Sequence, residues 1–219
     1  MTLIKFHVEG GVNKNQDGEM REGFRKFFAG LDEAVRARGN SVRFVLHGSR
    51  RKAYEQFCAA LQDEPGAYHV LLVDSEDPVA HRGECWRHLQ ERQADGWERP
   101  AGVEEAQCQL MAEAVEAWFF ADREAVEAFY GPGFQTSSLP SRQNIEQIPK
   151  SEHIASLEAA TKQTKKEQYH KKKHPPALLS RMSAEKVRAR AWHCDRIFVT
   201  LSAKFGEAMA PLCTLRAEP

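Results

Sequence analysis

The sequence predicts an α/β fold with a mostly parallel, four-stranded central sheet that is flanked by helices and decorated by further helices towards the C-terminus. Short apolar runs rich in β-branched residues occur at residues 3–8, 42–46 and 68–73, as is typical of buried parallel strands. Amphipathic stretches at 19–38 and 50–61 separate these runs. Strands that alternate with helices at this spacing favour a parallel sheet with right-handed crossovers.

The later elements follow from the same patterns. A polar, glycine-bearing loop is expected at 9–18, directly after the first strand. In chain order we then expect a helix at 78–93, a fourth strand at 108–112, a helix from 115, a helix at 125–130, a long loop at 134–149, and C-terminal helices at 176–182, from 184, and at 197–205. Residues 1–133 are thus predicted to form the α/β core, and residues 134–219 a loop and basic helical extension packed on it.

The balance and distribution of charged residues indicate what kind of partner the protein binds. The 219 residues carry 31 basic and 31 acidic side chains, so net charge indicates no partner, but residues 161–196 hold eleven lysines and arginines against three acidic residues. Such an imbalance predicts a nucleic-acid-binding surface, for which the candidates are Lys162, Lys165, Lys166, Lys171, Lys172 and Lys173.

The cysteines and the hydropathy pattern indicate where the protein resides. Five scattered cysteines without a Cys-x-x-Cys pair disfavour a disulfide framework and favour the reducing cytoplasm. No apolar run approaches the roughly 18 residues of a membrane span, so we expect no membrane partner. The oligomeric state stays open, a homo-oligomer included.

Carboxylates end two of the predicted strands. Glu9 follows the first strand, and Asp74 and Glu76 follow the third, with Asp77 next. In doubly wound sheets the first strand commonly lies beside the third, and ligands bind at the carboxyl ends where the winding reverses. Clustered carboxylates repel one another, and a cation relieves the repulsion. Oxygen-only ligation suits Mg²⁺ or Mn²⁺, which points to phosphoryl or phosphodiester chemistry.

A purely structural interpretation is also open for these acidic residues. Carboxylates after a strand often cap the next helix, and Asp77 followed by Pro78 has the pattern of an N-cap residue and a proline in the first helical position.

The chain resembles a known fold family at the same residues. Glu9-Gly10 closing the first strand and Asp74-Ser75-Glu76 closing the third resemble the Toprim fold of topoisomerases, DnaG-type primases and OLD-family nucleases, with glutamate where Asp-x-Asp is usual. The segments 110–122, 148–150 and 169–171 and the terminal helix resemble uncharacterised Toprim-like bacterial proteins encoded beside an ABC-type or AAA-type ATPase.

That resemblance implies a metal-dependent nuclease of phage defence that works with an ATPase partner. It assigns Glu9 as general acid/base or first ligand, and Asp74 with Glu76 or Asp77 as the main ligands of Mg²⁺ or Mn²⁺. The same resemblance implies that Glu19 or Glu22 helps to bind a second metal. Glu116 is a further candidate ligand, or else a partly exposed helix carboxylate. Lys150 is a candidate catalytic residue that stabilises charge on the scissile phosphate, or else a solvated lysine.

A competing hypothesis keeps the fold without catalysis. The protein would then be a regulatory or adaptor subunit of an ABC- or AAA-type ATPase, with carboxylates that only cap helices. Converging carboxylates would favour the nuclease, whereas diverging carboxylates and a large apolar patch would favour the adaptor.

Overall fold

The central sheet of the computed structural model has four strands, all parallel, in the order β2-β1-β3-β4. The structure describes residues 1–11 and 14–215, with side chains 12–16 excepted. The strands are β1 (Leu3–Val8), β2 (Ser41–Leu46), β3 (Tyr68–Asp74) and β4 (Cys108–Met111). The predicted fold class is therefore confirmed, and so is the expectation that the first strand lies beside the third.

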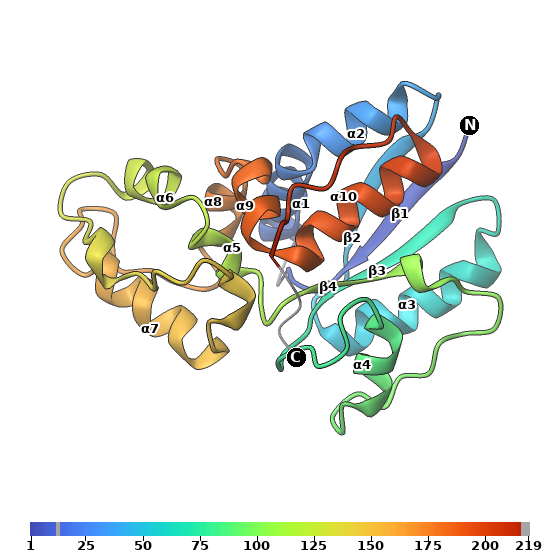
Figure 1. Ribbon diagram of the computed structural model, residues 1–219, viewed down its shortest axis with the longest axis horizontal. Coiled ribbons are helices and arrows are strands. Elements are labelled where there is room, and N and C mark those ends of the chain that lie inside the picture. Colours follow the sequence, from blue (N-terminus) through green and yellow to red (C-terminus); the bar gives the residue numbers. More distant parts are fainter. Residues whose placement is uncertain (12–13, 216–219) are drawn as a thin grey trace.

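Helices cover both faces of the sheet (Figure 1). One face carries α1 (Lys14–Phe27), α2 (Ala29–Arg36) and α10 (Trp192–Phe205), and the other carries α3 (Arg50–Asp63) and α4 (Cys85–Glu91). Each face has its own apolar core. Fully buried Phe6 and Phe28 lie in the first core, and Phe57 and Leu71 in the second. The two cores hold the sheet rigid, so the strand ends present their side chains from fixed positions.

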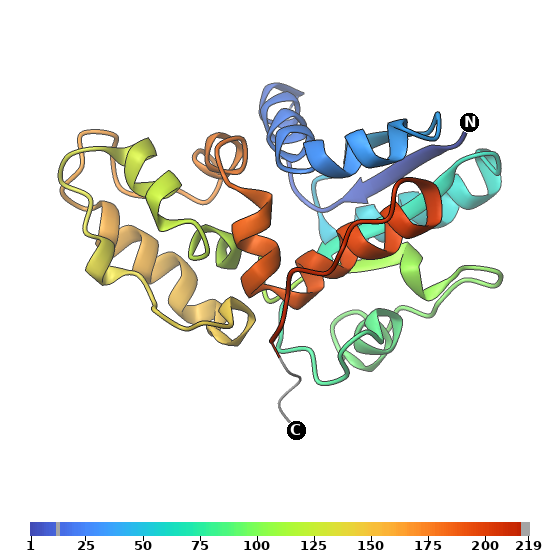
Figure 2. The same ribbon diagram turned by 45° about the horizontal axis from the view of Figure 1, so that its top comes forward.

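The remaining helices form a lobe beside the carboxyl edge of the sheet (Figures 1 and 2). This lobe consists of α5 (Glu116–Phe119), α6 (Arg123–Tyr130), α7 (Lys150–Thr161) and α8 (Pro175–Leu179). From it, α9 (Ala184–Arg190) leads back to α10, which packs against β4 and α2. The chain after residue 134 thus builds most of the lobe and also returns to the sheet.

Several helix predictions were wrong in their extent; the helix expected at 197–205, for example, begins at Trp192. The single helix expected at 19–38 is two helices, since Phe28, with ψ near 17°, interrupts the helical backbone, and α1 begins at Lys14 inside the predicted loop 9–18. Residues 12 and 13 of that loop lie outside the described residues. The helix expected at 78–93 begins only at Cys85, because Gly83 has a φ of 88° that no helix accommodates.

One helix escaped prediction. Helix α7 buries His153 and Thr161 beside Leu157 and Ala160, so its inner face does not look apolar in sequence. Each has one hydrogen bond close by in the chain, since His153 Nε2 lies 2.8 Å from the Ile148 carbonyl and the Thr161 hydroxyl donates to the Leu157 carbonyl at 2.7 Å, whereas His153 Nδ1 is buried without a partner among the described residues.

Candidate metal centre

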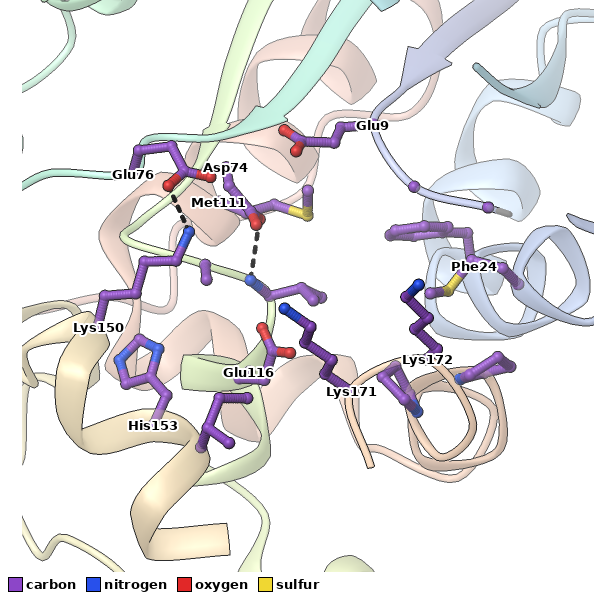
Figure 3. A pocket seen from close by; sticks show the side chains of 18 of the residues that line it. Glu9, Phe24, Asp74, Glu76, Met111, Glu116, Lys150, His153, Lys171 and Lys172 are labelled. Carbon is purple, nitrogen blue, oxygen red and sulfur yellow. Dashed lines mark hydrogen bonds and ion pairs between the residues drawn. The ribbon is translucent and has the colours of Figure 1, made fainter. Parts of the chain in front are cut away.

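Three carboxylates converge at the carboxyl edge of the sheet. Glu9 follows β1, Asp74 ends β3, and Glu76 lies two residues further; each offers an oxygen, and these oxygens all lie within 4.8 Å of one another. The parallel pairing of β1 with β3 produces this convergence, because both strands end at the same edge (Figure 3). Some sixty-five residues of sequence separate the two strand ends.

Backbone contacts fix the loops that carry these side chains. The Glu9 N–H donates to the Leu72 carbonyl at 3.2 Å, which ties the end of β1 to β3. Gly10 and Gly48 exchange two hydrogen bonds of 3.0 and 2.8 Å, so the loops after β1 and β2 are joined beside the cluster. Both glycines have positive φ values of 114° and 76°, a conformation that favours glycine.

Glu76 reaches the cluster by a turn and not by an extended strand. Its φ of 68° is unusual for a residue with a side chain, and its N–H donates to the Glu113 carbonyl at 2.9 Å. Strand geometry thus ends at Asp74, although the side chains of Asp74 and Glu76 still enter the same cluster.

The cluster is short of neutralising partners. Glu9 Oε2 is buried without a hydrogen-bond partner among the described residues, and its nearest cation, Arg50, lies 3.7 Å away. Arg50 is itself engaged by Asp95, at 2.6 Å, and donates to the Asp74 carbonyl. Asp74 Oδ1 accepts from the Val115 N–H at 3.0 Å. Glu76 is paired with Lys150, whose ammonium lies 2.6 Å from Oε2 (Figure 3).

Burial and mutual repulsion shift the acidity of the cluster. Burial, and then the neighbouring Glu9 and Glu116 carboxylates, raise the pKa of Asp74 well above its ordinary value. Burial also raises the pKa of Glu9, against the opposing effect of Arg50. An orphaned buried oxygen within a set of carboxylate oxygens suits a hard divalent cation, so these residues fit the Mg²⁺ or Mn²⁺ that the sequence predicted.

The cluster forms one wall of a cavity of about 480 Å³ between the sheet edge and the helical lobe. Glu116, Lys150, Lys171 and Lys172 line the same cavity. Glu116 Oε1 accepts a hydrogen bond of 3.1 Å from the buried Tyr169 hydroxyl, and burial raises the pKa of this carboxyl. Glu116 is therefore at the site, adjacent to the three clustered carboxylates, and is partly buried.

Other predicted residues lie away from the cavity. Asp77 points elsewhere and pairs with Arg92 at 2.7 Å, and it caps no helix, because α4 begins at Cys85. Glu22 pairs with Arg25 and Lys26 on the exposed side of α1. Glu19 is exposed and does not line the cavity. The structure therefore gives none of Asp77, Glu19 or Glu22 a place in the cluster.

The six candidate lysines of the basic segment separate into two groups. Lys171 and Lys172 line the cavity, whereas the other four do not. Lys173 pairs with Glu167 at 2.6 Å, Lys166 lies over the Phe129 ring, and Lys162 and Lys165 are exposed.

Two residues that contact the site were not predicted from the sequence. Arg50 lies beside Glu9 and the Asp74 carbonyl, and Glu113 accepts hydrogen bonds from the Lys150 and Glu76 N–H groups. Arg50 begins α3 after β2, and β2 ends at the same edge as β1, so its place after a strand was the available signal. Glu113 Oε2 accepts from the Lys150 N–H at 2.5 Å and thereby ties the start of α7 to the Glu76 loop. Nothing in the sequence indicates that contact.

The comparisons give a family. A family model described as a domain of unknown function (DUF4276) matches residues 9–202, which contain every residue of the carboxylate cluster and of the cavity. No curated protein and no solved structure matches the chain.

Proposed function

The chain belongs to the DUF4276 family, and we propose that it is a divalent-metal-dependent nuclease that hydrolyses phosphodiester bonds in the cavity between the sheet and the helical lobe. The observation that carries the proposal is the convergence of Glu9, Asp74 and Glu76 within 4.8 Å at the carboxyl edge of a parallel sheet. The Toprim resemblance of these residues is part of the same proposal.

Each side chain has a task in this proposal. Asp74 and Glu76 hold the cation, with Asp74 oriented by the Val115 N–H. When bound there, Mg²⁺ or Mn²⁺ would supply Lewis-acid stabilisation of the phosphoryl oxygens and would make an attacking water more acidic. Glu9, whose pKa is raised by burial and whose Oε2 has no hydrogen-bond partner among the described residues, accepts a proton at that atom or completes the ligand set.

Lys150 has a defined task as well. Its ammonium lies 2.6 Å from Glu76, so a phosphate held at the carboxylate cluster falls within its reach. There it would stabilise the charge on the scissile phosphate. The hydrogen bond from its own N–H to Glu113 fixes the residue at the first turn of α7.

The adaptor hypothesis finds less support. An adaptor of this kind is expected to have diverging carboxylates and a large exposed apolar patch. The carboxylates instead converge, and among the described residues the exposed large apolar side chains are Met1 and Leu212. No helix within the described residues is long and apolar enough to cross a membrane. The ATPase partner, the role in defence and the cytoplasmic location stay predictions that copurification and localisation would test.

Cleavage assays with matched variants test the proposed function. Labelled DNA and RNA are incubated with Mn²⁺ and wild type, Glu9→Gln, Asp74→Asn or Asp77→Asn. A metal centre contributes several kcal/mol of transition-state stabilisation, so the first two variants should lose about 100-fold or more in rate. Asp77→Asn removes a neighbouring carboxylate outside the cluster and should keep wild-type activity. Equal activity in all four proteins would refute the proposal.

A further inference from the structure

Two lysines of the helical lobe extend into the cavity opposite the carboxylates. Lys171 and Lys172 lie in the segment between α7 and α8; the Lys171 side chain reaches towards Glu116 and Asp74, and that of Lys172 extends on the side of the cavity where Phe24 lies (Figure 3). Neither forms an ion pair with the residues that the structure describes, in contrast to the adjacent Lys173, which is held by Glu167. Their charges are thus available to a ligand.

The segment that carries these lysines is anchored at both ends. The Tyr169 N–H donates to the Thr161 hydroxyl at 2.7 Å, and the Tyr169 side chain is buried. On the other side, His174 Nδ1 accepts from the His170 N–H at 3.0 Å and lies 2.9 Å from the Tyr130 hydroxyl. The backbone on either side of Lys171 and Lys172 is therefore held in place, and both residues line the cavity.

The charges of the cavity define the ligand chemistry. A cation at the carboxylates and two lysines across the cavity attract negative charge from two sides. Lys150 adds a third ammonium at the cation side. A chain of phosphodiesters meets this arrangement, with the scissile phosphate at the carboxylates and Lys150, and an adjacent phosphate at Lys171 and Lys172.

The size of the cavity restricts the form of that chain. A volume of about 480 Å³ lies within the range of small-molecule pockets and suits one nucleotide. Its side walls are apolar, with Met20 and Phe24 of α1, Ile154 of α7, and Pro175 and Pro176 of α8. A double helix is too large for a cavity of about 480 Å³, since one feature of the duplex, its major groove, already measures about 12 Å across. A paired nucleotide would have to leave its partner to reach the carboxylates.

We propose that this site takes single-stranded nucleic acid, either a free strand or an unpaired end, with one nucleotide in the cavity and its neighbouring phosphate on Lys171 and Lys172. The inference rests on the proposed function, since it assigns the substrate form of the same site.

Binding is measured by fluorescence anisotropy of one labelled oligonucleotide in three forms: single strand, blunt duplex, and duplex with an unpaired overhang. Ca²⁺ replaces Mn²⁺ in this assay, because carboxylate oxygens also bind Ca²⁺. Wild type should bind the single strand and the overhang about tenfold or more tightly than the blunt duplex. Equal affinity for all three forms, or no binding of any of them, would overturn the inference.

Two double variants test whether Lys171 and Lys172 are the lysines that contact the bound strand. Lys171→Gln/Lys172→Gln should weaken single-strand binding about tenfold and reduce the slope of log affinity against log salt by about 0.7, the value for one lost phosphate contact. Lys162→Gln/Lys165→Gln removes the same charge from exposed positions outside the cavity and should leave the slope near that of wild type. Equal slopes in the two variants would contradict the assignment.

The binding assay also separates this inference from the proposed function. Single-strand binding that depends on Lys171 and Lys172, without Mn²⁺-dependent cleavage, would reject the nuclease and keep the inference. Cleavage that depends on Glu9 and Asp74, together with equal binding of duplex and single strand, would keep the nuclease and reject the inference.

Discussion

Replacement of Asp74 by asparagine should make the metal-free protein more stable and abolish its stabilisation by metal. Asp74 shares the cluster with Glu9 and Glu76, with oxygens within 4.8 Å. At an effective dielectric constant near 20, two carboxylates at that separation repel by roughly 3 kcal/mol. Asparagine removes this repulsion, has nearly the same shape, and retains an oxygen that accepts the hydrogen bond from the Val115 N–H.

The expected gain is smaller than the pairwise repulsion. The pKa of Asp74 is raised well above its ordinary value, so part of the repulsion is already relieved by protonation. We expect a gain of about 2 kcal/mol at pH 7, which for a domain of this size raises Tm by roughly 4–8 °C. The sign agrees with linkage, because a folded-state pKa above the unfolded value means that ionisation of Asp74 destabilises the fold as pH rises through the folded pKa.

Thermal unfolding with and without Mn²⁺ is the assay. At 100 times its dissociation constant, Mn²⁺ should stabilise wild type by about 2.7 kcal/mol, whereas Asp74→Asn should gain little. Asp77→Asn, whose parent carboxylate pairs with Arg92 outside the cluster, should respond to Mn²⁺ as wild type does. If Asp74→Asn lowered Tm without metal and kept the full Mn²⁺ shift, the carboxylate cluster would not be the metal centre.

Two further predictions concern stability. His7 is buried between His47 and His69, and burial lowers its pKa from 6.5 to about 3; the unfolded chain therefore binds the extra proton first, and stability should fall by about 2 kcal/mol from pH 7 to pH 5. Urea titrations at both pH values check this. His7→Gln should reduce the loss, and because burial also lowers the pKa of His47, some loss remains; an unchanged loss in that variant would exclude His7 as a source. Arg188 and Asp195 form a buried pair at 2.8 Å, and Asp195 also accepts from the Leu212 and Cys213 N–H groups. Arg188→Ala should cost about 3–5 kcal/mol in urea unfolding because it leaves a buried carboxylate unpaired, whereas the exposed control Arg51→Ala should change stability by less than about 1 kcal/mol.

The sequence by itself determined the α/β class and the main carboxylates. Apolar runs such as 68–73 favour buried strands, and a carboxylate directly after a buried strand must lie at its end, so the order of residues was enough to assign Glu9 and Asp74 to strand ends. Local chemistry of this kind depends on neighbours in the chain, which a sequence displays.

Tertiary structure alone decided which charged groups meet at the cavity. The turn at Glu76 depends on a hydrogen bond from its N–H to the Glu113 carbonyl, and the position of Lys150 on another from its own N–H to the Glu113 side chain. Helix α7 was not predicted, because only the folded structure shows that its inner face buries the polar residues His153 and Thr161. Asp77 and Lys171 are both charged residues in polar segments, and the sequence does not indicate which of the two side chains faces the cavity. One faces Arg92 outside the cavity and the other faces the carboxylates across it, because long-range packing, and not residue type, sets the direction of a side chain.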